Sequence, residues 1–123
     1  MKPAHGEVYE LDLTGFPELG SWEARPGVVV SSDFFNRRLD TVVVVALTRN
    51  LKRKDQAGCI LVPQSSAGKS PGLKADSVAL CHSPLTVPKG VLGRRLGKLP
   101  ADLLSDIEET LAFALNLGPS LGE

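Results

Sequence analysis

The densest group of basic side chains in the sequence lies at residues 49–54. It contains Arg49, Asn50, Lys52, Arg53 and Lys54. Guanidinium and ammonium groups bind phosphate oxygens, and amide groups can read the edges of nucleic-acid bases. This composition is compatible with binding of a polyanion. A run of charge also describes an ordinary solvated surface, and the run alone does not separate the two.

A second basic group of interest is Arg25, which immediately precedes Pro26. Proline restricts the residue before it to an extended conformation, and a planar guanidinium can donate two parallel hydrogen bonds to a phosphate. The same arginine could form a surface salt bridge instead. Both interpretations stay open on this residue alone.

The formal net charge of zero conceals a separation of charge along the chain. Residues 1–24 carry one basic and five acidic side chains, residues 25–98 carry thirteen basic and four acidic ones, and residues 99–123 carry five acidic ones and no base. A basic central segment can present a phosphate-binding face while the acidic ends lie elsewhere.

Motifs for several other chemistries are incomplete. Residues 68–70 (GKS) end like a phosphate-binding loop, but Pro63 stands where that motif needs its first glycine. Cys59, Cys81 and His82 include no C-x-x-C pair, and the sequence has no G-x-S-x-G turn. We therefore expect no metal, no cofactor and no serine-hydrolase triad.

Length and composition predict a single globular domain over residues 1–123, since 42% of the residues are hydrophobic and 23% are charged. Two cysteines are too few for a disulfide scaffold, and the start does not read as a secretory leader, so we expect buried thiols and a cytoplasmic protein. The longest apolar run covers residues 42–47, whereas a membrane-spanning helix needs about 20 residues, so no membrane association is expected.

The hydrophobic pattern predicts a mainly β protein. Strands are expected from period-two alternation and from β-branched residues, with a polar connection at residues 31–40. The expected strands cover residues 9–13, 28–30, 41–48, 59–62 and 77–81, and weaker signals lie at 85–87 and 95–96 because glycines interrupt them. Residues 100–117 repeat apolar side chains at three- and four-residue steps, which predicts an amphipathic helix. The fold expected from these elements is a small, partly open β-barrel with a C-terminal helix packed on it.

Several segments resemble, in order, the MazF/PemK/Kid family of toxin–antitoxin endoribonucleases. Residues 5–13 (HGEVYELDL) resemble the family's RGDIYWVDL, and residues 25–31 (RPGVVVS) resemble its RP-[VL]-[LV]-V-V-S pattern. Further similarities are residues 36–37 (NR) in the following loop, 41–48 (TVVVVALT) to T-x-I-V-A-P-I-T, 72–81 (GLKADSVALC) to GLKKDSVVLC, and 92–99 (LGRRLGKL) to LGKRIGRL. The resemblance extends over about residues 5–118.

The resemblance implies an SH3-like or plasmid-maintenance-type barrel, a homodimer, and a MazE-like antitoxin as partner. It also implies metal-independent, sequence-specific cleavage of single-stranded RNA, including mRNA, that arrests translation and growth. The substrate's own 2′-hydroxyl would attack the phosphate, leaving 2′,3′-cyclic phosphate and 5′-hydroxyl ends.

By resemblance, Arg25 matches the family's catalytic arginine and Thr48 its active-site threonine. A threonine hydroxyl can orient the scissile phosphate or the 2′-oxygen but is not a base at neutral pH. His82 replaces an acidic residue that some members use as the general base. An imidazole can do that work at neutral pH, can stack on a base or can face solvent, and these three roles stay open.

The resemblance also places the basic run beside the RNA groove and a loop at residues 14–24 over it. We therefore expect RNA contacts from Trp22, Arg49, Asn50, Lys52, Arg53, Lys54 and Ser83. Two other functions are weighed against RNA cleavage. One is a non-enzymatic toxin of the same barrel superfamily that targets DNA gyrase, as CcdB-like proteins do, and the other is a degenerate family member that binds RNA without cutting it.

Overall fold

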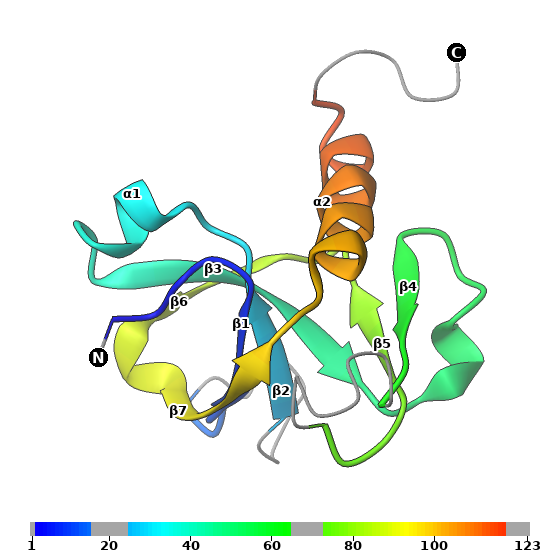
Figure 1. The fold of residues 1–123 in the computed structure, drawn as a ribbon, viewed down its shortest axis with the longest axis horizontal. Helices are drawn as coiled ribbons and strands as arrows, with labels where there is room; N and C mark the ends of the chain where they lie inside the picture. Colours follow the sequence, from blue (N-terminus) through cyan, green and yellow to red (C-terminus); the bar gives the residue numbers. More distant parts are fainter. Residues whose placement is uncertain (1, 16–24, 65–72, 118–123) are drawn as a thin grey trace.

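A computed structural model describes residues 2–15, 25–64 and 73–117 of the chain, and Figure 1 shows their arrangement. The strands are β1 (Glu7–Leu11), β2 (Arg25–Val29), β3 (Thr41–Thr48), β4 (Cys59–Val62), β5 (Ser77–Leu80), β6 (Leu85–Pro88) and β7 (Leu92–Lys98). The helices are α1 (Asp33–Asn36) and α2 (Ala101–Ala114), with single 3-10 turns η2 (Leu51–Arg53) and η3 (Lys89–Val91). No helix in the described ranges is long and apolar enough to cross a membrane.

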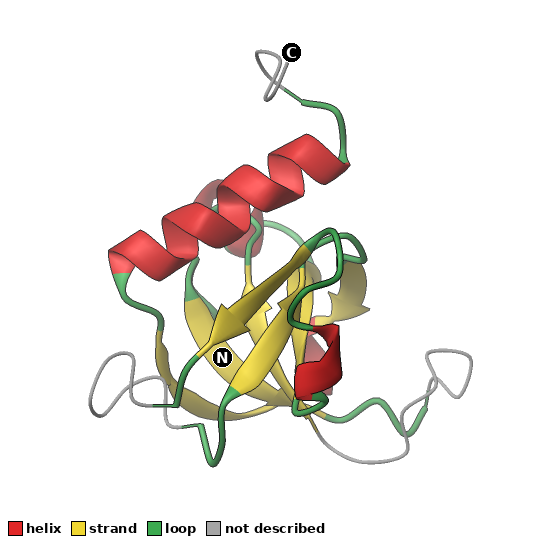
Figure 2. Cartoon of the chain, turned by 90° about the vertical axis from the view of Figure 1, so that its right-hand side faces the viewer, coloured by secondary structure: helices red, strands yellow, loops and turns green. Residues whose placement is uncertain are grey.

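The strands form one bent antiparallel sheet in the order β4-β5-β3-β2-β1-β7, and β6 pairs with β3 beside β5. β3 is the central strand, because it pairs with β2 along one edge and with both β6 and β5 along the other. Seen from the side, the sheet curls into an open barrel, and α2 lies across one end of it (Figure 2). This architecture confirms the predicted mainly β fold with a C-terminal helix.

The bent sheet buries side chains on both faces, in two clusters. Val45 and Leu47 of β3 belong to the cluster beneath α2, and Val42 and Val44 belong to a second cluster with Leu11 of β1. A strand buried on both faces reads as a continuous apolar run rather than an alternating one. That is why β3 has the bounds that its β-branched sequence predicts.

Two elements differ from the expectation. β7 runs over seven residues although it contains Gly93 and Gly97, and it pairs with β1 through two irregularities of register. A Cβ atom at Gly93 would lie 3.3 Å from the carbonyl oxygen of Glu10, so glycine allows the two strands to approach closely here. The connection at residues 31–40 is not wholly irregular, because it contains the single turn α1.

α2 ends three residues earlier than the apolar pattern predicts. Asn116 takes a left-handed conformation, with φ of 57°. The Leu117 and Asn116 N–H groups then donate to the carbonyls of Ala112 and Phe113, which completes a Schellman motif. Only Leu104 and Ile107 of α2 are buried, whereas Phe113 and Leu115 are exposed on the half that projects beyond the barrel (Figure 1).

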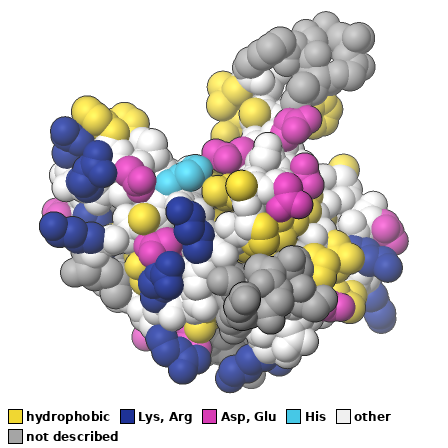
Figure 3. Space-filling view, in the orientation of Figure 1, with side chains coloured by type: hydrophobic (Ala, Val, Ile, Leu, Met, Phe, Trp, Pro, Cys, Tyr) yellow, Lys and Arg dark blue, Asp and Glu magenta, His cyan; other side chains and the backbone are white. Residues whose placement is uncertain are grey.

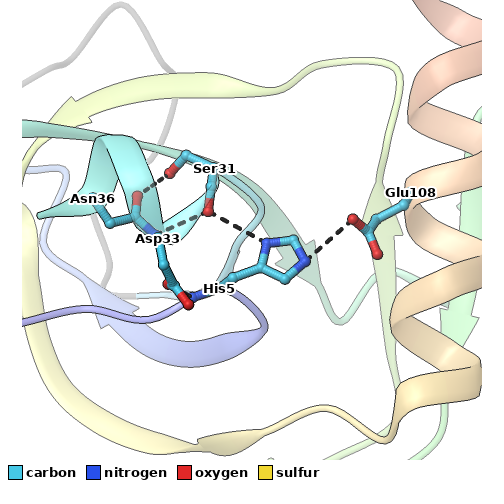
Figure 4. A network of polar contacts seen from close by, with 5 residues as sticks. All are labelled: His5, Ser31, Asp33, Asn36 and Glu108. Carbon is cyan, nitrogen blue, oxygen red and sulfur yellow. Dashed lines mark hydrogen bonds and ion pairs between the residues drawn. The ribbon is translucent and has the colours of Figure 1, made fainter.

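A polar network around His5 joins α2 to the start of the chain (Figure 4). His5 Nε2 lies 3.2 Å from Glu108 of α2, and its Nδ1 lies 3.3 Å from the Ser31 carbonyl oxygen. The His5 N–H donates to Asp33 at 2.8 Å, and the buried Asn36 side chain donates to the same Ser31 carbonyl. These contacts hold α1, the N-terminal segment and α2 together.

Glu7 gives the fold a pH-dependent contribution. Burial alone would raise the pKa of Glu7, but hydrogen bonds from Arg95, the Ala4 N–H and the Tyr9 hydroxyl together lower it. A carboxylate whose pKa is lower in the folded chain than in the unfolded chain stabilises the fold above its unfolded pKa. This contribution disappears as the pH falls through the folded pKa.

We therefore expect Glu7→Gln to lower the free energy of unfolding at neutral pH by about 1.5–3 kcal/mol, the range for hydrogen bonds to charged groups. Urea denaturation at a series of pH values measures the difference between the two proteins. The difference should shrink as the medium becomes acidic. A destabilisation that stays constant down to strongly acidic pH would contradict the assignment.

Candidate functional site

The site is built where β2 begins and β3 ends. The antiparallel β2–β3 ladder ends at the pair Gly27–Ala46, and Arg25 and Thr48 each lie two residues beyond that pair on their own strands. On its other side Thr48 pairs with Val78 at the start of β5. Three strands thus bring residues far apart in the sequence to one end of the sheet.

A pocket of about 160 Å³ opens at this end of the sheet. Its lining among the described residues is Glu10, Arg25, Pro26, Arg49, Leu73, Lys74, Ala75, Ser77, Arg94 and Leu96. Four of these side chains are basic and one is acidic, so the pocket favours an anion. Its apolar members give it walls against which a flat or aliphatic group can pack.

The charges in and around the pocket are partly paired. Arg94 of β7 lies 3.1 Å from Glu10 of β1, and the neighbouring Arg95 pairs with Glu7. The acidic start of the sequence therefore lies against part of its basic middle. On the face that Figure 3 shows, Lys and Arg side chains gather on the barrel with some Asp and Glu side chains among them, and further Asp and Glu side chains lie along α2.

Thr48 lies beside the pocket and is not part of its lining. Its side chain is half-buried, and its hydroxyl oxygen accepts a hydrogen bond of 3.2 Å from the Asn50 N–H. This bond fixes the oxygen and leaves the hydroxyl hydrogen free to donate to an anion. The strand end thus presents an oriented donor next to Arg25.

The basic run after β3 divides into residues with different roles. Arg49 lines the pocket. Asn50 caps η2, since its side-chain oxygen accepts from the Lys52 N–H at 3.2 Å, and Arg53 donates to Gln56 at 3.1 Å. Lys52 and Lys54 are exposed. The structure therefore brings one of the five predicted RNA-contacting residues of this run into the pocket.

His82 and Ser83 lie at the opposite end of β5 from Ser77. Both are exposed in the turn that follows β5, and His82 lies over the β4 end of the sheet, with Nδ1 3.9 Å from Cys59 Sγ. Three residues of strand after Val78 carry the chain about 10 Å away from Thr48. The structure does not bring His82 together with Arg25 and Thr48 within one chain. Trp22 falls outside the described residues.

The two cysteines have different environments, and the expectation that both thiols are buried is wrong for Cys59. Cys81 is buried, and burial followed by the proximity of Cys59 raises the pKa of its thiol to about 11. Cys59 is half-buried. No cluster of three potential metal ligands occurs in the described parts of the chain.

Sequence reasoning missed Glu10, Lys74, Ser77 and Arg94 as residues of the pocket. Glu10 and Arg94 look like the polar positions of ordinary strands, and their proximity depends on the β1–β7 pairing. Lys74 and Ser77 belong to the segment at residues 72–81, whose resemblance to the family does not point to any one of its residues.

A larger hollow of about 340 Å³ lies between α2 and β4. Its lining in the described ranges is Ile60, Asp106, Glu109, Thr110 and Phe113, which includes no basic group. We therefore place the candidate site at the smaller pocket, where anion-binding groups converge.

Comparison with known proteins gives consistent results. Residues 4–115 match the family described as the PemK-like, MazF-like toxin of type II toxin–antitoxin systems. The chain is 32% identical over 117 residues to endoribonuclease MazF2 of Mycobacterium bovis. This alignment covers 93% of this chain and 97% of that protein.

Solved structures agree with the sequence comparison. A structure of an endoribonuclease from a mycobacterial species has a TM-score of 0.75 at 27% identity, covering 98% of this chain and 97% of the other. A mycobacterial endoribonuclease solved in complex with its cognate antitoxin has a TM-score of 0.73 at 26% identity, covering 97% and 98% of the two chains. The similarity therefore extends over nearly the whole of each chain.

Proposed function

The chain belongs to the PemK-like, MazF-like family of type II toxins, and we propose on that premise that it is an endoribonuclease whose phosphate-binding centre is Arg25 with Thr48. The observation that carries the proposal is a pocket with four basic side chains, Arg25 among them, at the end of the sheet where β2 begins and β3 ends. The substrate is single-stranded RNA, including mRNA, and cleavage arrests growth.

In this reaction the substrate supplies its own nucleophile, so the protein has to position and stabilise rather than attack. The ribose 2′-oxygen attacks the adjacent phosphorus in line with the departing 5′-oxygen, and negative charge grows on the equatorial phosphate oxygens. The Arg25 guanidinium can donate two hydrogen bonds to these oxygens as the charge develops. Cleavage needs no metal and leaves 2′,3′-cyclic phosphate and 5′-hydroxyl ends.

Thr48 acts as an orienting donor in this mechanism. Its oxygen is already held by the Asn50 N–H, so its hydrogen points elsewhere and can meet a phosphate oxygen or the 2′-oxygen. Arg49, Lys74 and Arg94 hold the phosphates that flank the reacting one. Lys52, Arg53 and Lys54, which lie outside the pocket, steer the polyanion toward it.

The partner that controls this activity is a cognate antitoxin of the MazE type. A homologue has been solved in complex with its antitoxin. An acidic, disordered antitoxin segment competes with RNA for the basic pocket, because both are flexible polyanions. The functional unit is a homodimer in the cytoplasm, and its groove runs across both subunits. In such a groove, His82 and Ser83 of one subunit can contact RNA that is bound at the pocket of the other subunit.

Digestion of a labelled RNA in excess chelator tests the proposal. We expect the purified protein to cut at one short sequence, to leave cyclic-phosphate and 5′-hydroxyl ends, and to stop cutting when saturated with antitoxin. Growth arrest without any RNA cleavage would refute the nuclease function and favour a protein target such as gyrase. Cleavage that continues unchanged under saturating antitoxin would refute competition at the pocket.

A further inference from the structure

A nuclease of this kind needs a group that accepts the proton of the 2′-hydroxyl, and the residues assigned so far do not provide one. Arginine stays protonated. A neutral threonine hydroxyl is a very weak base, and it does not lose its own proton at neutral pH. His82 of the same chain lies at the far end of β5 from Thr48. Among the residues that the structure describes, we therefore looked for the acceptor in the lining of the pocket.

Glu10 is the single acidic side chain among the described residues that line the pocket. It is the penultimate residue of β1, where it pairs with Pro26, the residue next to Arg25. Arg25 and Glu10 line the same pocket of about 160 Å³, so both face the space in which a bound phosphate would lie. A site residue on a paired strand is held more rigidly than one on a loop.

The surroundings of Glu10 suit a proton acceptor. One carboxylate oxygen, Oε1, lies 3.1 Å from the Arg94 guanidinium, which orients the group and leaves Oε2 available. The charged groups that share the pocket with Glu10 are Arg94 from β7, Arg25 from β2, Arg49 after β3 and Lys74 before β5. All four are cations, and Arg94 is the one that contacts the carboxylate.

We propose that the Glu10 carboxylate is the general base of the cleavage reaction, an inference that rests on the proposed endoribonuclease function. Glu10 takes the proton of the 2′-hydroxyl while the bond from the 2′-oxygen to phosphorus forms. The bond from phosphorus to the 5′-oxygen breaks, its electron pair stays on that oxygen, and a water molecule protonates it. Glu10 then returns its proton to solvent, so the carboxylate is regenerated and no oxidant, reductant or metal is consumed.

The test is single-turnover cleavage by the full-length protein across a range of pH, comparing wild type with Glu10→Gln and Glu10→Asp. Glutamine keeps the size of the side chain and an oxygen that can accept from Arg94, but it cannot take the proton. Glu109→Gln, an exposed position on α2 away from the pocket, is the matched control. RNA affinity is measured separately on a substrate with a 2′-deoxy residue at the cut site, which binds but cannot react.

We expect Glu10→Gln to slow cleavage by about a hundredfold or more, the contribution typical of a positioned base. The affinity for the deoxy-substituted RNA should change little, because the groups that hold phosphate are intact. If the wild-type rate falls toward acidic pH, that fall should be absent from the Glu10→Gln profile. Glu10→Asp should retain part of the rate, and Glu109→Gln should match wild type.

Three results would overturn the inference. The first is a Glu10→Gln protein that cleaves within a few-fold of wild type with the same pH profile. The second is a loss that appears wholly in RNA affinity, and the third is an altered cut sequence at an unchanged maximal rate, which would make Glu10 a base-reading residue. If wild type cuts RNA and Arg25→Ala does not, the proposed function stands whichever way Glu10 behaves. If wild type does not cut at all, the function and the inference fall together.

Discussion

Arg25→Ala is expected to reduce the rate of RNA cleavage by about a hundredfold to a thousandfold, the loss typical of removing one preorganised donor from a developing oxyanion. Arg25 lines the basic pocket at the start of β2, so alanine removes the guanidinium that we propose to bind the reacting phosphate. Single-turnover digestion of a labelled RNA measures the effect directly.

Two variants sharpen this experiment. Arg25→Lys keeps the charge but loses the planar pair of donors, so it should recover only part of the activity. Arg37→Ala removes an exposed arginine at the end of α1, outside the pocket lining, and should cleave like wild type. Equal losses in Arg25→Ala and Arg37→Ala would mean that general electrostatic attraction, not a specific phosphate contact, explains the role of Arg25.

Ile107→Ala is expected to lower the free energy of unfolding by about 2–5 kcal/mol. Ile107 is 0% exposed and packs into the cluster that contains Val45 and Leu47 of β3, so alanine leaves a cavity between α2 and the sheet. Urea denaturation followed by circular dichroism measures the change as a lower midpoint at an unchanged slope.

The same helix supplies the control for this prediction. Leu115 is 49% exposed beyond the end of α2, and Leu115→Ala should leave the midpoint almost unchanged. Similar losses for the two variants would show that the projecting half of α2 is packed in solution against something that the isolated chain does not contain.

The parts of the fold that the sequence predicts well are those whose structure depends on neighbouring residues. β3 and β4 have the expected bounds, because buried strands are marked by uninterrupted apolar and β-branched residues. β7 was predicted only in part, since Gly93 weakens the local signal and the strand forms through its close approach to β1. α2 ends earlier than its apolar pattern predicts because Asn116 takes the left-handed conformation, which that pattern does not reveal.

The same distinction between local and long-range determinants applies to the residues of the candidate site. Arg25 and Thr48 could be singled out because each lies in a recognisable segment, and the β2–β3 pairing brings the start of β2 and the end of β3 to the same end of the sheet. Glu10 and Arg94 are separated by most of the chain, and their ion pair follows from a strand pairing that no local pattern reveals. His82 was singled out for its chemistry, and the turn after β5 carries it away from the pocket of its own chain.

The pairing of β1 with β7 has a consequence for the cell that synthesises this chain. β1, β2 and β3 leave the ribosome first and carry Glu10, Arg25 and Thr48, but Arg94 and Leu96 arrive only with one of the last elements. Until β7 has been translated, β1 lacks its second neighbour and the pocket lacks a wall. We therefore expect a chain that ends before β7 to lack the complete pocket and, with it, the proposed cleavage activity.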